Sequence, residues 1–169
     1  RSTLFPYTTL FRSDGCATLF GEGMLAATEQ VAAALITTPY GRDFDLRGLA
    51  ALRSTWESLG MGPIPAHSPV AGREIYYVES GVHVDGVLKD PTNYEPLPPE
   101  ALGAQRFIVL GKHSGRASIT YELSRLGMTG ADDSLVCCLL ARVRKAAAEN
   151  GGLVSQAHFR ELVRQEMTV

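Results

Sequence analysis

The chain has 169 residues, of which 45% are hydrophobic and 20% are charged, and its formal net charge is −2 at neutral pH. This composition is ordinary for a soluble globular protein, and the slight negative charge argues against nucleic acid as a main partner. No apolar run in the sequence reaches membrane-spanning length, so no membrane partner is expected.

The cysteine pattern points to a reducing compartment. The three cysteines are Cys16, Cys137 and Cys138, and two of them are adjacent. An odd count without a Cys-x-x-Cys spacing fits neither a disulfide framework nor a zinc site. We therefore expect a cytoplasmic protein.

The first thirteen residues, RSTLFPYTTLFRS, have no targeting pattern, because they contain neither an apolar core nor a basic amphipathic helix. They resemble the conceptual translation of a common sequencing-adapter oligonucleotide. We therefore expect residues 1–13 to be an artefact fused to a truncated reading frame, with the natural protein extending upstream of Asp14. A genuine N-terminal arm is the alternative.

Two helices are predicted in the following part of the chain. An alanine-rich stretch predicts a helix over 25–37. Asp45 can cap a second helix and Gly60 can end it. The apolar residues of this second helix recur at near-helical spacing and are Leu49, Leu52, Trp56 and Leu59. The proline-rich stretch 62–69 predicts an extended linker.

The stretch 78–115 concentrates the polar, glycine and proline residues of the chain. Helical spacing over 79–89 places Val84, Val87 and Leu88 on one face, with His83 beside them. Pro91 ends this helix, because proline disfavours the helical conformation of the residue before it. A turn over 92–94 then presents the hydroxyl of Tyr94.

The second half of this stretch predicts a short helix opening at Pro98–Glu100 and a strand over 106–110, which is rich in β-branched and aromatic residues. The glycine-flanked turn 111–115 follows and opens another helix. Such a turn, with Lys112 and Arg116 beside it, suits an anionic group. It is not a Walker loop, which needs a longer spacing. A packing role for the histidine and the tyrosine is the alternative to chemistry.

Three helices are predicted beyond this stretch. The first runs from Gly115 to Leu126, the second over 134–149 with Asp132 or Asp133 as its cap, and the third after Ser155. The apolar residues expected to be buried are Leu135, Val136, Leu139, Leu140 and Val143 in the second helix, and Phe159, Leu162, Val163 and Met167 in the third.

Two longer motifs resemble a known family. ESGVHVDGVLKDPTNYEPLPPEALG and IVLGKHSGR are similar to the region that follows the barrel in homocitrate synthases and 2-isopropylmalate synthases. The segments HVDGVLKDP and GKHSGR are closer in sequence to the nitrogen-fixation type of homocitrate synthase. The resemblance extends from about Phe20 to about Leu126.

The resemblance implies a mixed α/β, mostly helical fold. Residues 14–62 would be a TIM-barrel remnant that includes the last barrel helix and the helix after it. Residues 63–113 would form a small lid subdomain with the catalytic motif, and residues 114–169 a helical C-terminal subdomain.

The resemblance also implies an activity, the Claisen-type condensation of acetyl-CoA with 2-oxoglutarate to homocitrate, followed by release of CoA. A sister enzyme using another 2-oxo acid, an isopropylmalate or citramalate synthase, is the first alternative. A non-catalytic lid or interaction module is the second.

The resemblance assigns roles to two residues, and four residues near them are further candidates. His83 and Tyr94 match a Ser-Gly-x-His motif with a tyrosine eleven residues later, which in the family lie on a lid that closes over the barrel mouth of a partner subunit. They are therefore the expected catalytic residues of a homodimer. Glu79 and Asp85 are expected to orient the histidine. Lys112 and Arg116 are expected to meet acidic groups of the substrate or of CoA, with ordinary surface charges as the alternative.

The metal ligands of the family are missing here. The family holds a divalent ion with a His-x-His pair, whereas the histidines of this chain are His67, His83, His113 and His158. We therefore expect no metal site and no independent activity in this chain, and Mg²⁺, Mn²⁺ or Zn²⁺ in the full-length enzyme.

Overall fold

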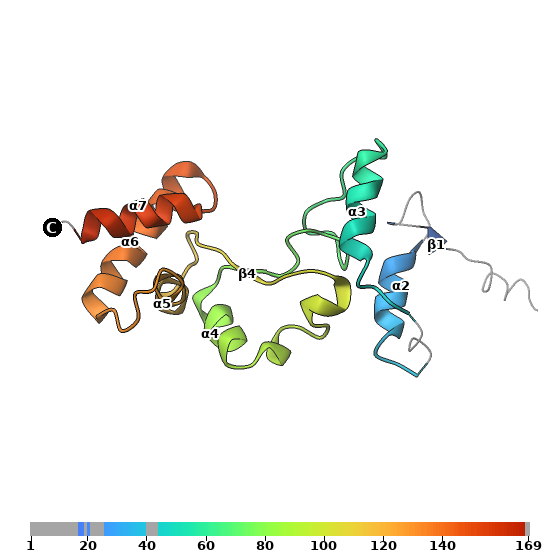
Figure 1. Ribbon diagram of the computed structural model, residues 1–169, viewed down its shortest axis with the longest axis horizontal. Helices are drawn as coiled ribbons and strands as arrows, with labels where there is room; N and C mark the ends of the chain where they lie inside the picture. The colour runs from blue at the N-terminus through green and yellow to red at the C-terminus, as the bar shows by residue number, and fades with distance from the viewer. Residues whose placement is uncertain (1–16, 19, 21–25, 40–43, 168–169) are drawn as a thin grey trace, which may run out of the picture. The chain divides into compact units, whose positions relative to one another are not determined.

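The computed structural model describes residues 17–18, 20, 26–39 and 44–167. The expected artefact at 1–13 and Cys16 lie outside these residues. The described part of the chain is mostly helical, and its strands have two residues each (Figure 1). This confirms the prediction of a mostly helical, mixed α/β chain. None of the described helices is long and apolar enough to cross a lipid bilayer.

The chain forms two compact units. The first comprises the residues up to Tyr76 together with Pro99–Gln105, and the second comprises Tyr77–Pro98 and Arg106–Val169. These limits differ from the predicted boundaries at 62 and 113, which came from a resemblance and not from packing. The predicted domains therefore stay a prediction.

The first unit contains β1 (Ala17–Thr18), β2 (Ala26–Ala27), α2 (Thr28–Leu35), α3 (Leu49–Ser58) and the 3₁₀ helix η3 (Pro99–Leu102). The two strands pair in parallel. Trp56 of α3 packs edge-to-face on Phe20 with the ring centroids 5.2 Å apart. The backbone N–H of Phe20 donates to the buried carboxylate of Glu29 at 3.0 Å, which ties the segment before β2 to α2.

The predicted cap of α3 is wrong. Helix α3 begins after Gly48, and the Asp45 carboxylate instead accepts hydrogen bonds from the backbone N–H and the guanidinium of Arg47. This pairing lowers the pKa of Asp45 and occupies the oxygens that a cap would use. The predicted stripe is also incomplete, since Leu52 and Leu59 are 41% and 72% exposed. The end of the helix at Gly60, where φ is +76°, is confirmed.

The second unit contains β3 (Tyr77–Val78), α4 (Gly81–Lys89), the 3₁₀ helix η2 (Pro91–Asn93), β4 (Phe107–Ile108), α5 (Arg116–Arg125), α6 (Asp133–Asn150) and α7 (Gln156–Glu166). Strands β3 and β4 pair in parallel, with Tyr77 opposite Phe107. The strand predicted over 106–110 is shorter than expected, but Leu110 still forms a bridge with Val154.

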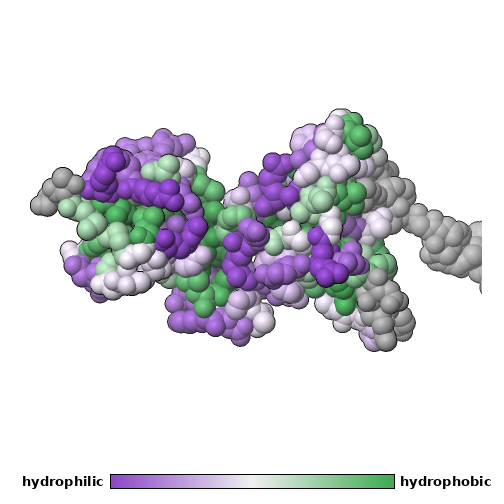
Figure 2. Space-filling view, viewed as in Figure 1, coloured by the Kyte–Doolittle hydropathy of each residue, from purple (hydrophilic) through white to green (hydrophobic). Residues whose placement is uncertain are grey.

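Helices α5, α6 and α7 gather around one apolar core (Figure 1). Its buried members are Leu110, Ile119, Leu123, Val136, Leu139, Val143, Ala146, Ala147, Val154, Phe159, Leu162 and Val163. Polar and apolar residues are interspersed on the outer surface (Figure 2). In the predicted stripes, Leu135 and Leu140 are only partly buried and Met167 is 65% exposed, because these residues lie at the edges of the contact.

The predicted ends of these helices are confirmed. The Asp132 carboxylate accepts from the N–H of Leu135 at 2.9 Å, and the Ser155 hydroxyl accepts from the N–H of His158 at 3.2 Å. Gly127 and Gly151 follow their helices with φ values of +83° and +66°. Each cap is formed by residues that lie next to the helix end in the sequence, which is why the sequence pattern predicts these ends.

Helix α4 ends before Pro91 as predicted, and the residue before this proline, Asp90, is extended with a φ of −156°. Val84 and Val87 are buried, at 0% and 2% exposure. Leu88 is 47% exposed, so its predicted place in the buried stripe is wrong. It lies at the edge of the stripe and lines a surface pocket.

Candidate functional site

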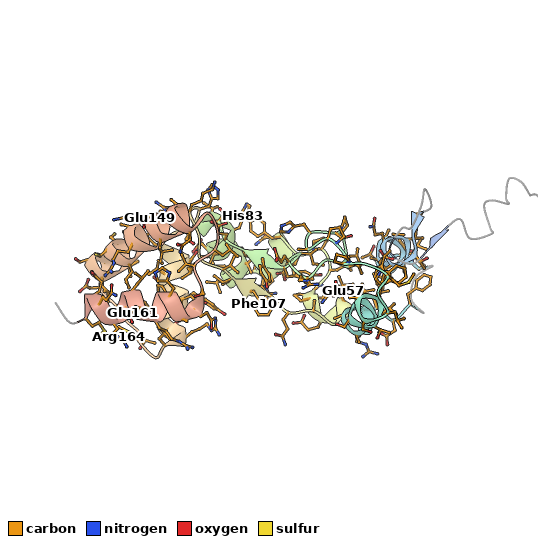
Figure 3. All side chains as sticks on the ribbon, turned by 90° about the horizontal axis from the view of Figure 1, so that it is seen from above. Glu57, His83, Phe107, Glu149, Glu161 and Arg164 are labelled. Carbon is orange, nitrogen blue, oxygen red and sulfur yellow. The ribbon has the colours of Figure 1, made fainter. Side chains whose placement is uncertain are left out.

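The rings of His83 and Tyr94 lie against each other, with their centroids 4.8 Å apart and their planes inclined by 45°. His83 projects from α4 (Figure 3). Tyr94 follows directly after η2. The separation is typical of an aromatic pair in contact. Both side chains are exposed, Tyr94 at 45%, so an imidazole and a phenol are presented together at the surface of this unit.

Two polar contacts hold the turn that carries Tyr94. On one side, the Asp90 carboxylate accepts from the backbone N–H of Thr92 at 3.0 Å and caps η2. On the other side, Arg106 donates two hydrogen bonds to the Glu95 carboxylate, at 2.6 and 2.5 Å. The Glu95 side chain is only 6% exposed, so the bidentate pair anchors the residue next to Tyr94 in a buried position.

The two sequence motifs meet backbone to backbone. A Cβ on Gly81, at the start of α4, would lie 2.5 Å from the Cα of Gly115, which precedes α5. Only glycine permits this approach on either side. The N–H of His113 donates to the Glu79 carboxylate at 2.7 Å, which adds a second link between the motifs. Glu79 thus holds the turn 111–115, and its predicted role beside His83 stays a prediction.

Helix α6 contacts the same turn through the side chain of Arg144. Arg144 donates from Nε and Nη2 to the carbonyl oxygen of Ser114, at 3.0 and 2.6 Å. Ser114 is fully buried, and its hydroxyl accepts from the N–H of Gly111 at 2.9 Å. The turn is therefore a fixed part of the scaffold under α4.

Residues 70–151 match the family model described as "Homocitrate synthase post-HMGL domain-like". The matched segment includes the His83–Tyr94 pair, the turn 111–115 and all of α6. Residues 70–151 are therefore similar to this domain family.

Curated relatives of the chain carry several names. A "Probable 2-isopropylmalate synthase" of Ignicoccus hospitalis is 42% identical over 101 residues, which are 60% of this chain and 25% of the relative. A homocitrate synthase of Methanocaldococcus jannaschii is 36% identical over 102 residues, 60% of this chain and 25% of the relative. An (R)-citramalate synthase of the same organism is 34% identical over 141 residues, 83% of this chain and 28% of the relative. The chain thus spans about a quarter of these relatives.

Arg116 is already paired. Its guanidinium forms an ion pair with Asp133 at the start of α6, and it lies 3.5 Å from the sulfur of Cys137. The hydrogen bond to Asp133 raises the pKa of Arg116. A ligand would therefore compete with Asp133 for this cation. Lys112 is exposed in the turn, and the predicted substrate contacts of both residues stay predictions.

Asp85 lies on the side of α4 away from His83, since residues two apart on a helix do not face each other. Its carboxylate pairs with Lys89 at 2.7 Å. It also lines a pocket of about 420 Å³ between α4 and α5, with Leu88, Arg116, Ala117, Thr120, Tyr121 and Ser124. The structure thus brings His83 and Tyr94 together and puts Asp85 on another face, where its predicted role in orienting the histidine stays a prediction.

Several residues that build the site were not singled out from the sequence. Gly86 leaves room for the Tyr94 ring, Arg144 holds the turn, and the Glu95–Arg106 pair anchors Tyr94. A glycine in the middle of a helix was the one signal that could have been noticed, because it weakens a helix unless packing requires it. The other two contacts join segments far apart in the sequence and leave no local pattern.

In the part of the chain that the structure describes, no cluster of three or more His, Cys, Asp or Glu side chains could hold a metal ion. The described residues therefore do not fit the divalent ion that the family resemblance implies, and no step of the proposed chemistry passes through one here. The predicted lack of a metal site in this chain stays a prediction.

Proposed function

We propose that this chain is the C-terminal part of an acyltransferase that condenses acetyl-CoA with 2-oxoglutarate to homocitrate and then releases CoA. The proposal rests on the contact between His83 and Tyr94, whose ring centroids lie 4.8 Å apart on an exposed face of the segment that matches the post-HMGL domain. The relatives named homocitrate synthase support the substrate.

In this proposal the imidazole of His83 moves protons. Carbon–carbon bond formation needs a proton taken from the methyl group of acetyl-CoA and a proton given to the alkoxide that forms from the ketone. Histidine suits both steps, because its ordinary pKa lies near neutrality. The Tyr94 hydroxyl can donate a hydrogen bond to oxygen as negative charge develops there. Water then cleaves the thioester and CoA leaves as the thiol.

The rest of the active site belongs to other parts of the intact enzyme in this proposal. A barrel, of which α2 is the last helix, binds the 2-oxo acid and the divalent ion. The exposed His83–Tyr94 pair reaches that barrel from a lid, across the interface of a cytoplasmic homodimer. Lys112 and Arg116 are candidates for the acidic groups of the substrate or of CoA.

The test replaces His83 with alanine in the intact enzyme. Loss of general acid–base catalysis typically costs 10²–10⁴-fold in turnover. We expect a loss of about that size with an unchanged fold, because the side chain is exposed. His158→Ala is the matched control, since this histidine lies on α7. Wild-type turnover in His83→Ala would end the assignment.

A second candidate differs only in the 2-oxo acid. The relative with 42% identity is named an isopropylmalate synthase, which favours a branched-chain 2-oxo acid as the substrate. Analysis of the products that the intact enzyme forms from acetyl-CoA, with 2-oxoglutarate, 2-oxoisovalerate and pyruvate in competition, separates the candidates. Homocitrate as the main product supports the first proposal, and isopropylmalate or citramalate supports the alternative.

A further inference from the structure

Gly86 lies in the middle of α4, three residues after His83, so both residues are on the same face of the helix. The Tyr94 ring fills the space where a side chain at this position would be. A Cβ on Gly86 would lie 2.4 Å from Cε2 of Tyr94 and 3.2 Å from both Cζ and the hydroxyl oxygen. The first distance is too short for any carbon–carbon contact, so ring and Cβ cannot both be there.

Glycine is a poor choice for this position on local grounds. It is the weakest helix former apart from proline, and alanine at a helix interior would stabilise α4 by itself. A residue that breaks a local rule in this way is expected where another requirement overrides the rule. Here the three atoms nearest to a Cβ all belong to the side chain of Tyr94.

We propose that Gly86 is a positioning residue, which leaves a notch on α4 that seats the Tyr94 ring against the His83 imidazole. This inference rests on the proposed function, because it assigns Gly86 to the reacting pair. With alanine at position 86, the helix backbone stays and the half-exposed tyrosine side chain moves, since it is the mobile partner in the clash. The phenol ring of Tyr94 then loses its contact with the imidazole of His83.

The first experiment observes the ring pair directly, in this chain and without any turnover. Proton NMR of the wild-type chain should give nuclear Overhauser cross-peaks between the His83 and Tyr94 rings. In Gly86→Ala we expect these cross-peaks to be lost, together with the ring-current shift of the His83 protons. Gly152→Ala is the control, because a Cβ there meets nothing within 4 Å and the backbone is outside the left-handed region. Retained cross-peaks in Gly86→Ala overturn the inference.

The second experiment removes the ring and asks whether alanine is then tolerated. In a Tyr94→Ala background, Gly86→Ala should raise the melting temperature by a few degrees, as its helix propensity predicts, and by clearly more than in the wild type. An equal change in both backgrounds overturns the inference. If Gly86→Ala prevents folding by itself, the double variant should fold, and a double variant that stays unfolded also overturns it.

The third experiment uses the intact enzyme and separates this inference from the proposed function. Displacement of a catalytic group by about 1 Å can cost about 100-fold in rate. We expect Gly86→Ala to lower kcat by a factor of this order with little change in KM. Lost cross-peaks with normal kcat would mean that the ring pair has no catalytic role, so the proposed function and the role of Gly86 would fail together. If Gly86→Ala retains the cross-peaks while His83→Ala still loses turnover in the intact enzyme, the role of Gly86 alone is overturned and the proposed function stands.

Discussion

The site segment, residues 78–115, and the cluster of α5, α6 and α7 are stabilised by different kinds of contact. The helical cluster buries a continuous set of aliphatic side chains with Phe159 at 1% exposure. The site segment buries few large side chains and relies on close backbone approaches at glycines and on the Glu95–Arg106 pair. Apolar packing accepts many side chains of similar volume. A contact between two backbones accepts only glycine, so the site segment should be the more exacting part in sequence and the smaller contributor to stability.

The largest loss of stability is therefore expected in the helical cluster. Phe159→Ala should lower the free energy of unfolding by about 3–5 kcal/mol, the usual cost of removing a buried phenylalanine. Urea unfolding of the chain measures it. Met167→Ala, directly after the same helix, is the control and should cost under about 0.5 kcal/mol, since Met167 is 65% exposed. A loss below about 1 kcal/mol for Phe159→Ala would break the comparison, because the cluster would then not carry the stability.

The next effect tests the contact between the two motifs. Gly115→Ala introduces a Cβ 2.6 Å from the Cα of Gly81, and neither backbone can move as freely as a side chain. The φ of Gly115 is −119°, so the backbone conformation itself is compatible with alanine. We expect a loss of about 2 kcal/mol from overpacking. Urea unfolding of Gly115→Ala and of the control Gly152→Ala, which meets open space, gives the difference. Equal stabilities would show that the backbones separate without cost.

The Glu95–Arg106 pair should matter less. Glu95→Gln keeps the shape but removes the charge from a carboxylate that is 6% exposed in its side chain, while Arg106 is 29% exposed and partly hydrated. Because solvent screens Arg106, we expect a loss of about 1.5 kcal/mol, at the lower end for hydrogen bonds to charged groups. Asp85→Asn breaks an exposed pair and should cost under about 0.5 kcal/mol. Equal losses in the two variants would contradict the role of burial.

The helical cluster was readily predicted from the sequence because its signals are local. Asp132 and Ser155 lie immediately before their helices, and Gly151 lies immediately after one. The same reasoning failed at Asp45, because a basic residue two positions later competes for the carboxylate. It also failed at Leu88. Helical spacing predicts which residues share one face of a helix, but it does not predict how much of that face the neighbouring helix buries.

The site segment was predicted only in part. The family resemblance pointed to His83 and Tyr94, and the structure brings their rings into contact. The contact of Gly81 with Gly115 and of Glu79 with the N–H of His113 joins residues 34 apart, so no local pattern contains either contact. Spacing arguments find residues that share one helix face. They do not find residues that two separate segments bring together.

The smallest expected effect concerns an exposed polar contact on the helical cluster. A hydrogen bond with the Cys138 thiol, helped by Arg142, lowers the pKa of the Glu166 carboxyl below its ordinary 4.5. A carboxyl with a lower pKa in the folded state stabilises the fold above its ordinary pKa, and this contribution disappears as the pH falls through the lowered value. Cys138→Ala should therefore raise the Glu166 pKa, measured by carbon NMR titration, and make acid unfolding slightly less steep. Cys137→Ala should change neither, because its thiol lies by Arg116. Equal shifts in both variants would mean that the neighbouring helix charge, and not the thiol contact, sets the Glu166 pKa.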